Sequence, residues 1–315
     1  MMTLLMLPFL LAIRTSINND GSRHIPVYTY TAQVSCYSLN STTNLKTKPF
    51  HMTSTLKCHP RLPTVLNCRV DSAIVRSQNR ALLDLGETSM DTWELGMEPF
   101  EIHFDRKGVV MVHVDESMPT WMIGIIKPIV DQLNIGFDLR TQPYIGTFET
   151  KERSYIGNCQ TIITINQRLN HMKHVWPDIS AYTIISVRNK GIDNDEILEI
   201  VKERNLKHCS IDYDPVIHRK TASSTIYKNV PTRMTTSMSR ILISDTNYTS
   251  FTANDLLAKN LITGETVQLF EEITLVLDSV TTKSIDSSQN HRSEEKSSDP
   301  RDEQDADSDT MAQAA

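Results

Sequence analysis

Glycine is scarce in this sequence, with only 10 in 315 residues, and neither a glycine-rich phosphate loop nor a GxSxG nucleophile motif occurs. These absences argue against a nucleotide-dependent enzyme and against an ordinary serine hydrolase. No two cysteines have CxxC spacing, which argues against a cysteine-ligated zinc site. Lysine and arginine together number 32, against 38 acidic residues, so no surplus of positive charge favours general binding of nucleic acid. We therefore expect a protein that is not an enzyme, needs no cofactor and binds no nucleic acid.

Long apolar runs are also missing, apart from a short one near the amino terminus. Residues 4–13 are largely apolar, which is typical of a signal peptide and too short to span a bilayer, although no lysine or arginine precedes them. We predict a signal peptide over residues 1–16; the alternatives are a buried first helix or a misassigned start. Residues 284–315 hold nine acidic and three basic residues and few apolar ones, which predicts a disordered, serine-rich acidic tail. Residues 17–283 are left as the predicted folded domain.

The most informative segment is residues 99–133, where strand alternation changes to helical spacing. Phe100, Ile102 and Phe104 alternate with polar residues, a DRKG turn follows, and a second alternating strand runs over residues 110–115. The apolar residues then recur at helical spacing. They include Trp121, Ile125, Ile126, Ile129, Val130 and Leu133. A helix that is apolar on most sides needs neighbours on most sides, so we expect it inside a barrel or beneath a strongly curved sheet.

Two residues disturb this predicted central helix. Gly124 and Pro128 disfavour a helix interior by about 1 and about 3 kcal/mol respectively. We therefore expect the helix to be kinked or divided near Lys127.

The clearest amphipathic helix pattern lies at residues 193–207. Asp193 or Asn194 can cap its start, acidic residues fill its first turn, and basic residues fill its last. Its predicted buried side consists of Ile197, Ile200 and Val201. Most other regular structure is predicted as strand, at residues 27–34, 52–58, 64–75, 160–165, 222–227, 241–244 and 273–280.

The PFEIHF run and the apolar helix that a tryptophan begins resemble the amino-terminal module of insect vitellogenins, the large lipid transfer proteins of yolk. Three later features fit the resemblance in order: GNCQT at residues 157–161, the basic stretch that ends at Cys209, and SMSRILIS at residues 237–244. The resemblance implies a mainly β (α+β) fold, in which an antiparallel β-barrel surrounds a central helix and further helices lie at its periphery. It also implies a secreted lipid transport and nutrient storage protein.

The five cysteines cannot all pair within one chain. The resemblance implies a disulfide between Cys159 and Cys209. Cys58 and Cys68 could bridge neighbouring strands, or could be buried free thiols, and Cys36 is left over. In a secreted protein, the two N-x-S/T triplets at Asn40 and Asn247 would be glycosylation sites.

The resemblance also implies a receptor-binding surface. Its residues would be Lys202, Arg204, Lys207 and His208. Clustered cations next to a cysteine tether would complement the acidic repeats of a lipoprotein-type endocytic receptor. The alternative is that these bases only complement the carboxyl end of the predicted helix.

A metal site is not expected. His171, His174 and Asp178 lie close in the sequence, but no third nitrogen or sulfur ligand follows at a fitting spacing. The resemblance as a whole implies a truncated vitellogenin-like lipid transport module whose partners are a receptor and phospholipid. The alternatives are an extracellular regulatory or interaction protein that keeps the barrel without lipid cargo, or a partial fragment of a full-length vitellogenin.

Overall fold

The structure is a computed structural model. It describes residues 5–7, 11–15, 24–39, 46–62, 64–78, 90–94, 98–138, 145–169, 182–186, 196–211, 213, 232–244, 247–259 and 266–284.

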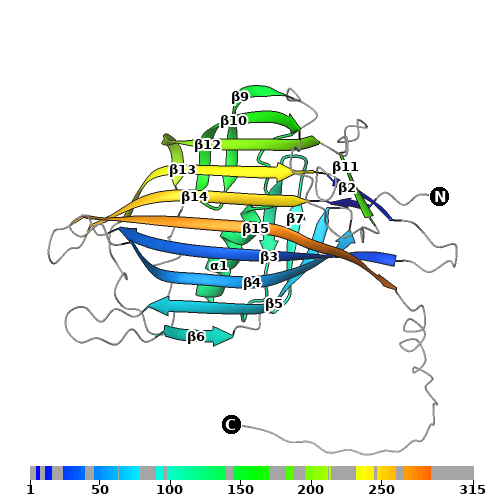
Figure 1. The fold of residues 1–315 in the computed structure, drawn as a ribbon, viewed down its shortest axis with the longest axis horizontal. Coiled ribbons are helices and arrows are strands. Elements are labelled where there is room, and N and C mark those ends of the chain that lie inside the picture. Colours follow the sequence, from blue (N-terminus) through cyan, green and yellow to red (C-terminus); the bar gives the residue numbers. More distant parts are fainter. Residues whose placement is uncertain are drawn as a thin grey trace, which may run out of the picture.

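One antiparallel sheet of 12 strands makes up most of the fold (Figure 1). Its strands follow the order β8-β7-β5-β4-β3-β15-β14-β13-β12-β10-β9, and β6 pairs with β5 beside this path. In chain order the strands are β3 (His24–Leu39), β4 (Lys46–Leu62), β5 (Val65–Gln78), β6 (Met90–Glu94), β7 (Phe100–Phe104), β8 (Val109–His113), β9 (Gly146–Ser154), β10 (Gly157–Leu169), β12 (Glu196–Ile211), β13 (Thr232–Ile243), β14 (Tyr248–Lys259) and β15 (Thr266–Ser284).

Helix α1 (Thr120–Asp131) lies behind the central strands of this sheet in the view of Figure 1. It contacts both β8 and β15, which stand far apart in the strand order, so the sheet curves around it. The predicted helix residues Ile125, Ile126, Ile129, Val130 and Leu133 are buried, and Trp121 is half-buried. The predicted mainly β fold around a central helix is thus confirmed.

Asn134 links the two ends of the strand order. Its side-chain oxygen accepts a hydrogen bond from the Val109 amide of β8 at 3.1 Å, and its side-chain nitrogen donates to the Arg153 carbonyl of β9 at 2.8 Å. A side chain just beyond the helix therefore spans the space between the two edge strands.

The apolar core lies between the inner face of the sheet and α1. On β3, for example, Tyr28, Tyr30, Ala32 and Val34 point inward, and every second residue of β4 from Phe50 to Cys58 does the same. This alternation is what strand geometry requires when one face of a sheet is buried.

One sequence prediction about helices is wrong, and one half of a second is wrong. Residues 196–211 form strand β12 rather than a helix, because pairing with β10 and β13 outweighs local helix propensity. Helix α1 is also undivided, although Pro128 lies within it and is buried. Among the described residues, α1 is the only helix, so the predicted peripheral helices are not found there.

A small second sheet joins β1 (Leu5–Leu7), β2 (Leu11–Thr15) and β11 (Tyr182–Ser186). The segment predicted as a signal peptide contains β1 and β2, and its removal stays a prediction. In the described part of the chain, no helix has the length and apolar character needed to cross a membrane. Several predicted features lie outside the described residues. They are the strand at residues 222–227, the helix caps Asp193 and Asn194, the glycosylation site Asn40, the residues His171, His174 and Asp178, and the tail beyond Ser284.

Candidate functional site at the separation of two strands

Strands β12 and β13 pair over only part of their length. Their register runs from Leu198 opposite Ile243 to Glu203 opposite Met238. Beyond that point β12 continues alongside β10, whereas the first residues of β13 pair with β14 alone. The two strands therefore separate, and a groove lies where they do.

This groove has a volume of about 450 Å³ and a mixed lining. Its apolar residues are Leu206, Ile211, Tyr213, Met234 and Leu256. Met234 and Leu256 are cross-strand partners and are buried, so they form its floor, while Ile211 is 46% exposed. The exposed residues Lys207 and Arg233 add two positive charges, and neither forms a salt bridge within the described part of the chain.

Tyr213 connects the groove to a buried polar cluster. Its hydroxyl donates a 2.5 Å hydrogen bond to Glu271, and its ring packs edge-on against Tyr155. Asn254 donates to the Tyr155 hydroxyl at 2.5 Å and to Glu271 at 3.2 Å. Burial raises the pKa of Tyr213 and of Tyr155 well above the ordinary value, so both remain protonated.

A second buried cluster lies deeper, at the carboxyl end of α1. The Lys202 ammonium lies 2.6 Å from Glu152, and the Arg204 guanidinium lies 3.2 Å from the other oxygen of that carboxylate. Arg204 also donates to the hydroxyls of Ser237 and Ser239 at 3.2 and 2.8 Å. Asp131 completes the cluster at 3.9 Å from Arg204.

This ion cluster also completes the end of the helix. Lys202 donates to the Asn134 carbonyl at 2.8 Å, and the Tyr248 hydroxyl donates to the Gln132 carbonyl at 2.5 Å. The carbonyls that follow a helix carry partial negative charge and need donors when they are buried. Lys202 and Tyr248 thus join the helix end to the sheet.

The two acidic groups of the cluster shift in opposite directions. Burial alone would raise the pKa of Glu152, but the cations of Arg204 and Lys202 together lower it below the ordinary value. For Asp131 burial dominates and raises the pKa to about 6. One oxygen of Asp131 is buried and accepts no hydrogen bond from the described residues, which agrees with weak stabilisation of its charge.

The structure divides the predicted receptor-binding surface. Lys202 and Arg204 are only 1% and 6% exposed and cannot reach a receptor, so their assignment to that surface was wrong. They point inward because alternate residues of β12 face the core, where Glu152 pairs with them. Lys207 and His208 are exposed, and a receptor role for these two stays a prediction.

The predicted cysteine pairs are close enough to bond. Cys159 and Cys209 form a disulfide between β10 and β12, and Cys58 and Cys68 form one between β4 and β5. Cys36 is buried and belongs to neither disulfide. Asn247 is half-buried, and its glycosylation stays a prediction.

Sequence reasoning missed most residues of the groove and of the buried clusters. Glu152 lies in β9 and Asn254 lies in β14, and neither strand was predicted. Polar residues alternate on β14, where Ser250, Thr252 and Asn254 are all buried, and this period of two was the available signal.

Comparison with known proteins gives a consistent result. A family model described as the vitellogenin N-terminal domain matches residues 27–285. A search of curated proteins returns no significant match. Among solved structures, the chain is similar to a lipovitellin structure that concerns lipid–protein interactions. The TM-score is 0.51 and the sequence identity is 12%. That alignment covers 81% of this chain and 25% of the lipovitellin chain.

Proposed function

This chain belongs to the vitellogenin N-terminal domain family, and from that premise we propose that it is a non-enzymatic, secreted lipid-transport module that binds phospholipid. We place the binding site at the groove between the separated ends of β12 and β13. The observation that carries this proposal is the combination of an apolar floor with two cations at its rim.

The chemistry of the groove matches the two parts of a phospholipid. Leu206, Met234 and Leu256 offer apolar surface to an acyl chain, whose removal from water contributes about 0.8 kcal/mol per buried CH₂ group. Lys207 and Arg233 offer charge-assisted hydrogen bonds to a phosphate. A volume of about 450 Å³ falls within the range of ligand pockets and accommodates part of one lipid.

The related structure concerns lipid–protein interactions in lipovitellin, and this chain spans about a quarter of that protein. The proposal is therefore limited to local binding of individual lipids by this module. The proposal also includes a role in yolk or other nutrient transport, which family membership supports.

Receptor binding is a second candidate function, because two exposed basic residues lie beside a disulfide. Lys207 and His208 immediately precede Cys209, which is bonded to Cys159, so the backbone that carries them is tethered to β10. Cations held in this way suit the acidic repeats of a lipoprotein-type receptor.

Native mass spectrometry with lipid extraction tests the lipid proposal directly. The protein would be purified from secreting cells, and binding to phosphatidylcholine vesicles with and without phosphatidylserine would also be measured. We expect phospholipid to co-purify at a defined stoichiometry and binding to be stronger to the anionic vesicles.

Charge reversal separates the two functions. Lys207→Glu with Arg233→Glu should weaken phospholipid binding at least about tenfold, because each lost charge-assisted bond is worth about 1.5–3 kcal/mol. Lys151→Glu with Arg153→Glu is the matched control, since both residues are exposed on β9 and lie outside the groove. Arg233→Glu alone should impair only lipid binding, and His208→Glu only receptor uptake. A lipid-free protein that is insensitive to the groove changes would contradict the lipid proposal and favour an interaction or regulatory role.

A further inference from the structure

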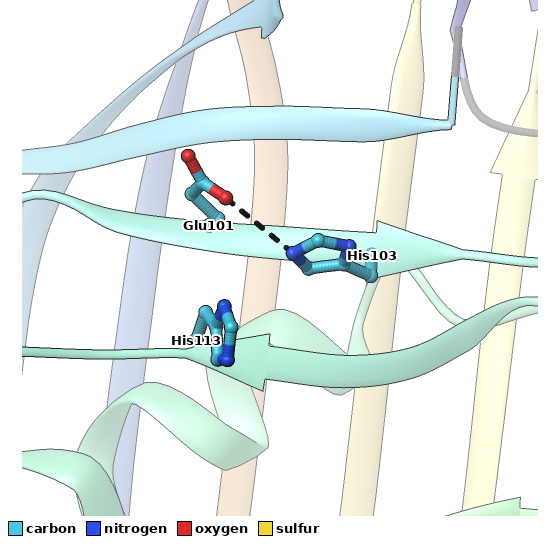
Figure 2. Close-up of side chains that lie close together, drawn as sticks. All are labelled: Glu101, His103 and His113. Carbon is cyan, nitrogen blue, oxygen red and sulfur yellow. Dashed lines mark ion pairs between the residues drawn. The ribbon is translucent and has the colours of Figure 1, made fainter. Parts of the chain in front are cut away.

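Three potential metal ligands meet on the outer face of the β7–β8 hairpin (Figure 2). Glu101 on β7 lies directly opposite His113 on β8, and His103 follows Glu101 by two residues. Because strand residues alternate between faces, His103 and Glu101 share one face, and the core residues Phe100, Ile102 and Phe104 occupy the other. One hairpin therefore brings two imidazoles and one carboxylate together.

The distances among these groups suit a metal ion. One potential ligand atom from each of the three side chains lies within 4.8 Å of the other two. His103 Nε2 lies 3.4 Å from Glu101 Oε2. Two ligands about 2.0–2.2 Å from a tetrahedral zinc ion are themselves about 3.4 Å apart. The first pair is thus already spaced for coordination, and His113 needs only a side-chain adjustment.

A second observation points to an ion at the same place. His103 Nε2 is buried and forms no hydrogen bond within the described part of the chain. Its contact with Glu101 at 3.4 Å is an ion pair, and a buried nitrogen that forms no hydrogen bond is uncommon in folded proteins; a bound ion would coordinate this nitrogen. Figure 2 shows this imidazole beside the Glu101 carboxylate, with His113 on the neighbouring strand.

Arg61 on β4 supports the carboxylate from outside the cluster. It forms a hydrogen bond and ion pair with Oε1 of Glu101, which leaves Oε2 directed at His103. Partners of this kind orient metal ligands in established sites.

We propose that Glu101, His103 and His113 form a zinc-binding site with three protein ligands and a fourth position for water. Two nitrogen ligands favour zinc over calcium or magnesium, which prefer oxygen. The bound ion would join β7 to the edge strand β8, which leads into helix α1. This inference does not depend on lipid binding, because none of the three ligands lines the groove.

Titration of the full chain with ZnCl₂ and with CoCl₂ tests the site. We expect the wild-type protein to bind one cobalt ion with the visible absorption of tetrahedral coordination and to gain thermal stability with zinc. His103→Ala and His113→Ala should each weaken zinc binding at this site at least about 10–100-fold, since even outer-shell changes cost that much. Glu101→Gln should also weaken binding while keeping a hydrogen-bonding side chain near Arg61.

The matched control is His208→Ala, which removes an exposed histidine on β12 far along the strand order from the hairpin. All titrations would also be repeated in a His171→Ala, His174→Ala background, so that binding there is not mistaken for this site. Loss of one equivalent in the His103 and His113 variants, with retention in His208→Ala, supports the proposal. Absence of tetrahedral cobalt absorption in the wild type, or equal zinc binding in all variants, overturns it. The wild-type spectrum gives this answer even if His103→Ala fails to fold.

Discussion

The ammonium group of Lys202 lies 2.6 Å from a carboxylate oxygen of Glu152, and both side chains are almost completely buried. The same lysine donates to the Asn134 carbonyl, so one buried cation joins strands β9 and β12 to the end of helix α1. Burying these charges costs desolvation free energy, which the close ion pair and its hydrogen bonds offset. Removing one partner should therefore cost far more than removing a surface charge.

Lys202→Met tests the importance of this pair for stability. We expect the free energy of unfolding to fall by about 3–5 kcal/mol, because Glu152 would lose one of its two cations and Asn134 a donor. Urea denaturation gives the measurement. Lys207→Met on the same strand is exposed and should change stability by no more than about 0.5 kcal/mol. Equal costs for the two variants would show that the buried pair contributes nothing.

Asp131 should make stability depend on pH. Burial raises its pKa from 3.8 to about 6, so the folded state binds a proton more tightly than the unfolded state. Asp131 therefore favours folding at low pH, and its contribution to the free energy of unfolding is lost as the pH rises from about 4 to above 6. Asp131→Asn should remove that loss, which is on the order of 3 kcal/mol.

The measurement compares urea denaturation of wild type and Asp131→Asn at several pH values. The variant should gain stability relative to wild type as the pH rises. Glu152 acts in the opposite direction, because its pKa is lowered, and its contribution is lost as the pH falls below its ordinary range. A difference between variant and wild type that does not change with pH would contradict the prediction.

Gly136 should not tolerate a side chain. Its φ is +86°, and an added Cβ would lie 2.7 Å from Cγ of the buried Glu152. Gly136→Ala therefore incurs backbone strain of about 1–3 kcal/mol and overpacking of about 1–3 kcal/mol. Gly146→Ala is the control, because its φ of +130° causes strain while no described residue beyond its two chain neighbours has an atom within 4 Å of the added Cβ. Thermal unfolding should show a larger loss of stability for Gly136→Ala than for Gly146→Ala. Equal losses of stability would show that overpacking against Glu152 contributes nothing.

The two disulfides should differ in their effect on stability. Cys159–Cys209 closes 50 residues of chain, whereas Cys58–Cys68 closes 10. The chain-entropy relation gives about 4 kcal/mol for the first and about 3 kcal/mol for the second. Replacing each pair with serine and measuring urea unfolding should recover this order. Cys36→Ala reports the cost of removing a buried sulfur atom outside both disulfides.

The hairpin and the central helix could be predicted from sequence because their local patterns agree with their tertiary environment. Phe100, Ile102 and Phe104 alternate and are buried together, and the apolar residues of α1 recur at helical spacing. Pro128 does not divide the helix, because the surrounding sheet buries the helix on most sides and stabilises it.

Other features depend on how distant segments assemble. Strand β12 has helix-forming residues, and its inward positions include Lys202 and Arg204, so it shows no apolar alternation that a sequence pattern can detect. Those cations face the core only because Glu152 on β9 and Asp131 at the end of α1 lie next to them and neutralise their charge. The groove likewise requires β12 and β13 to separate after Glu203, a matter of pairing between distant segments. Local sequence thus dictates where apolar residues must be covered, whereas the assembled sheet selects which charges are buried, because a buried charge is tolerated only when distant partners neutralise it.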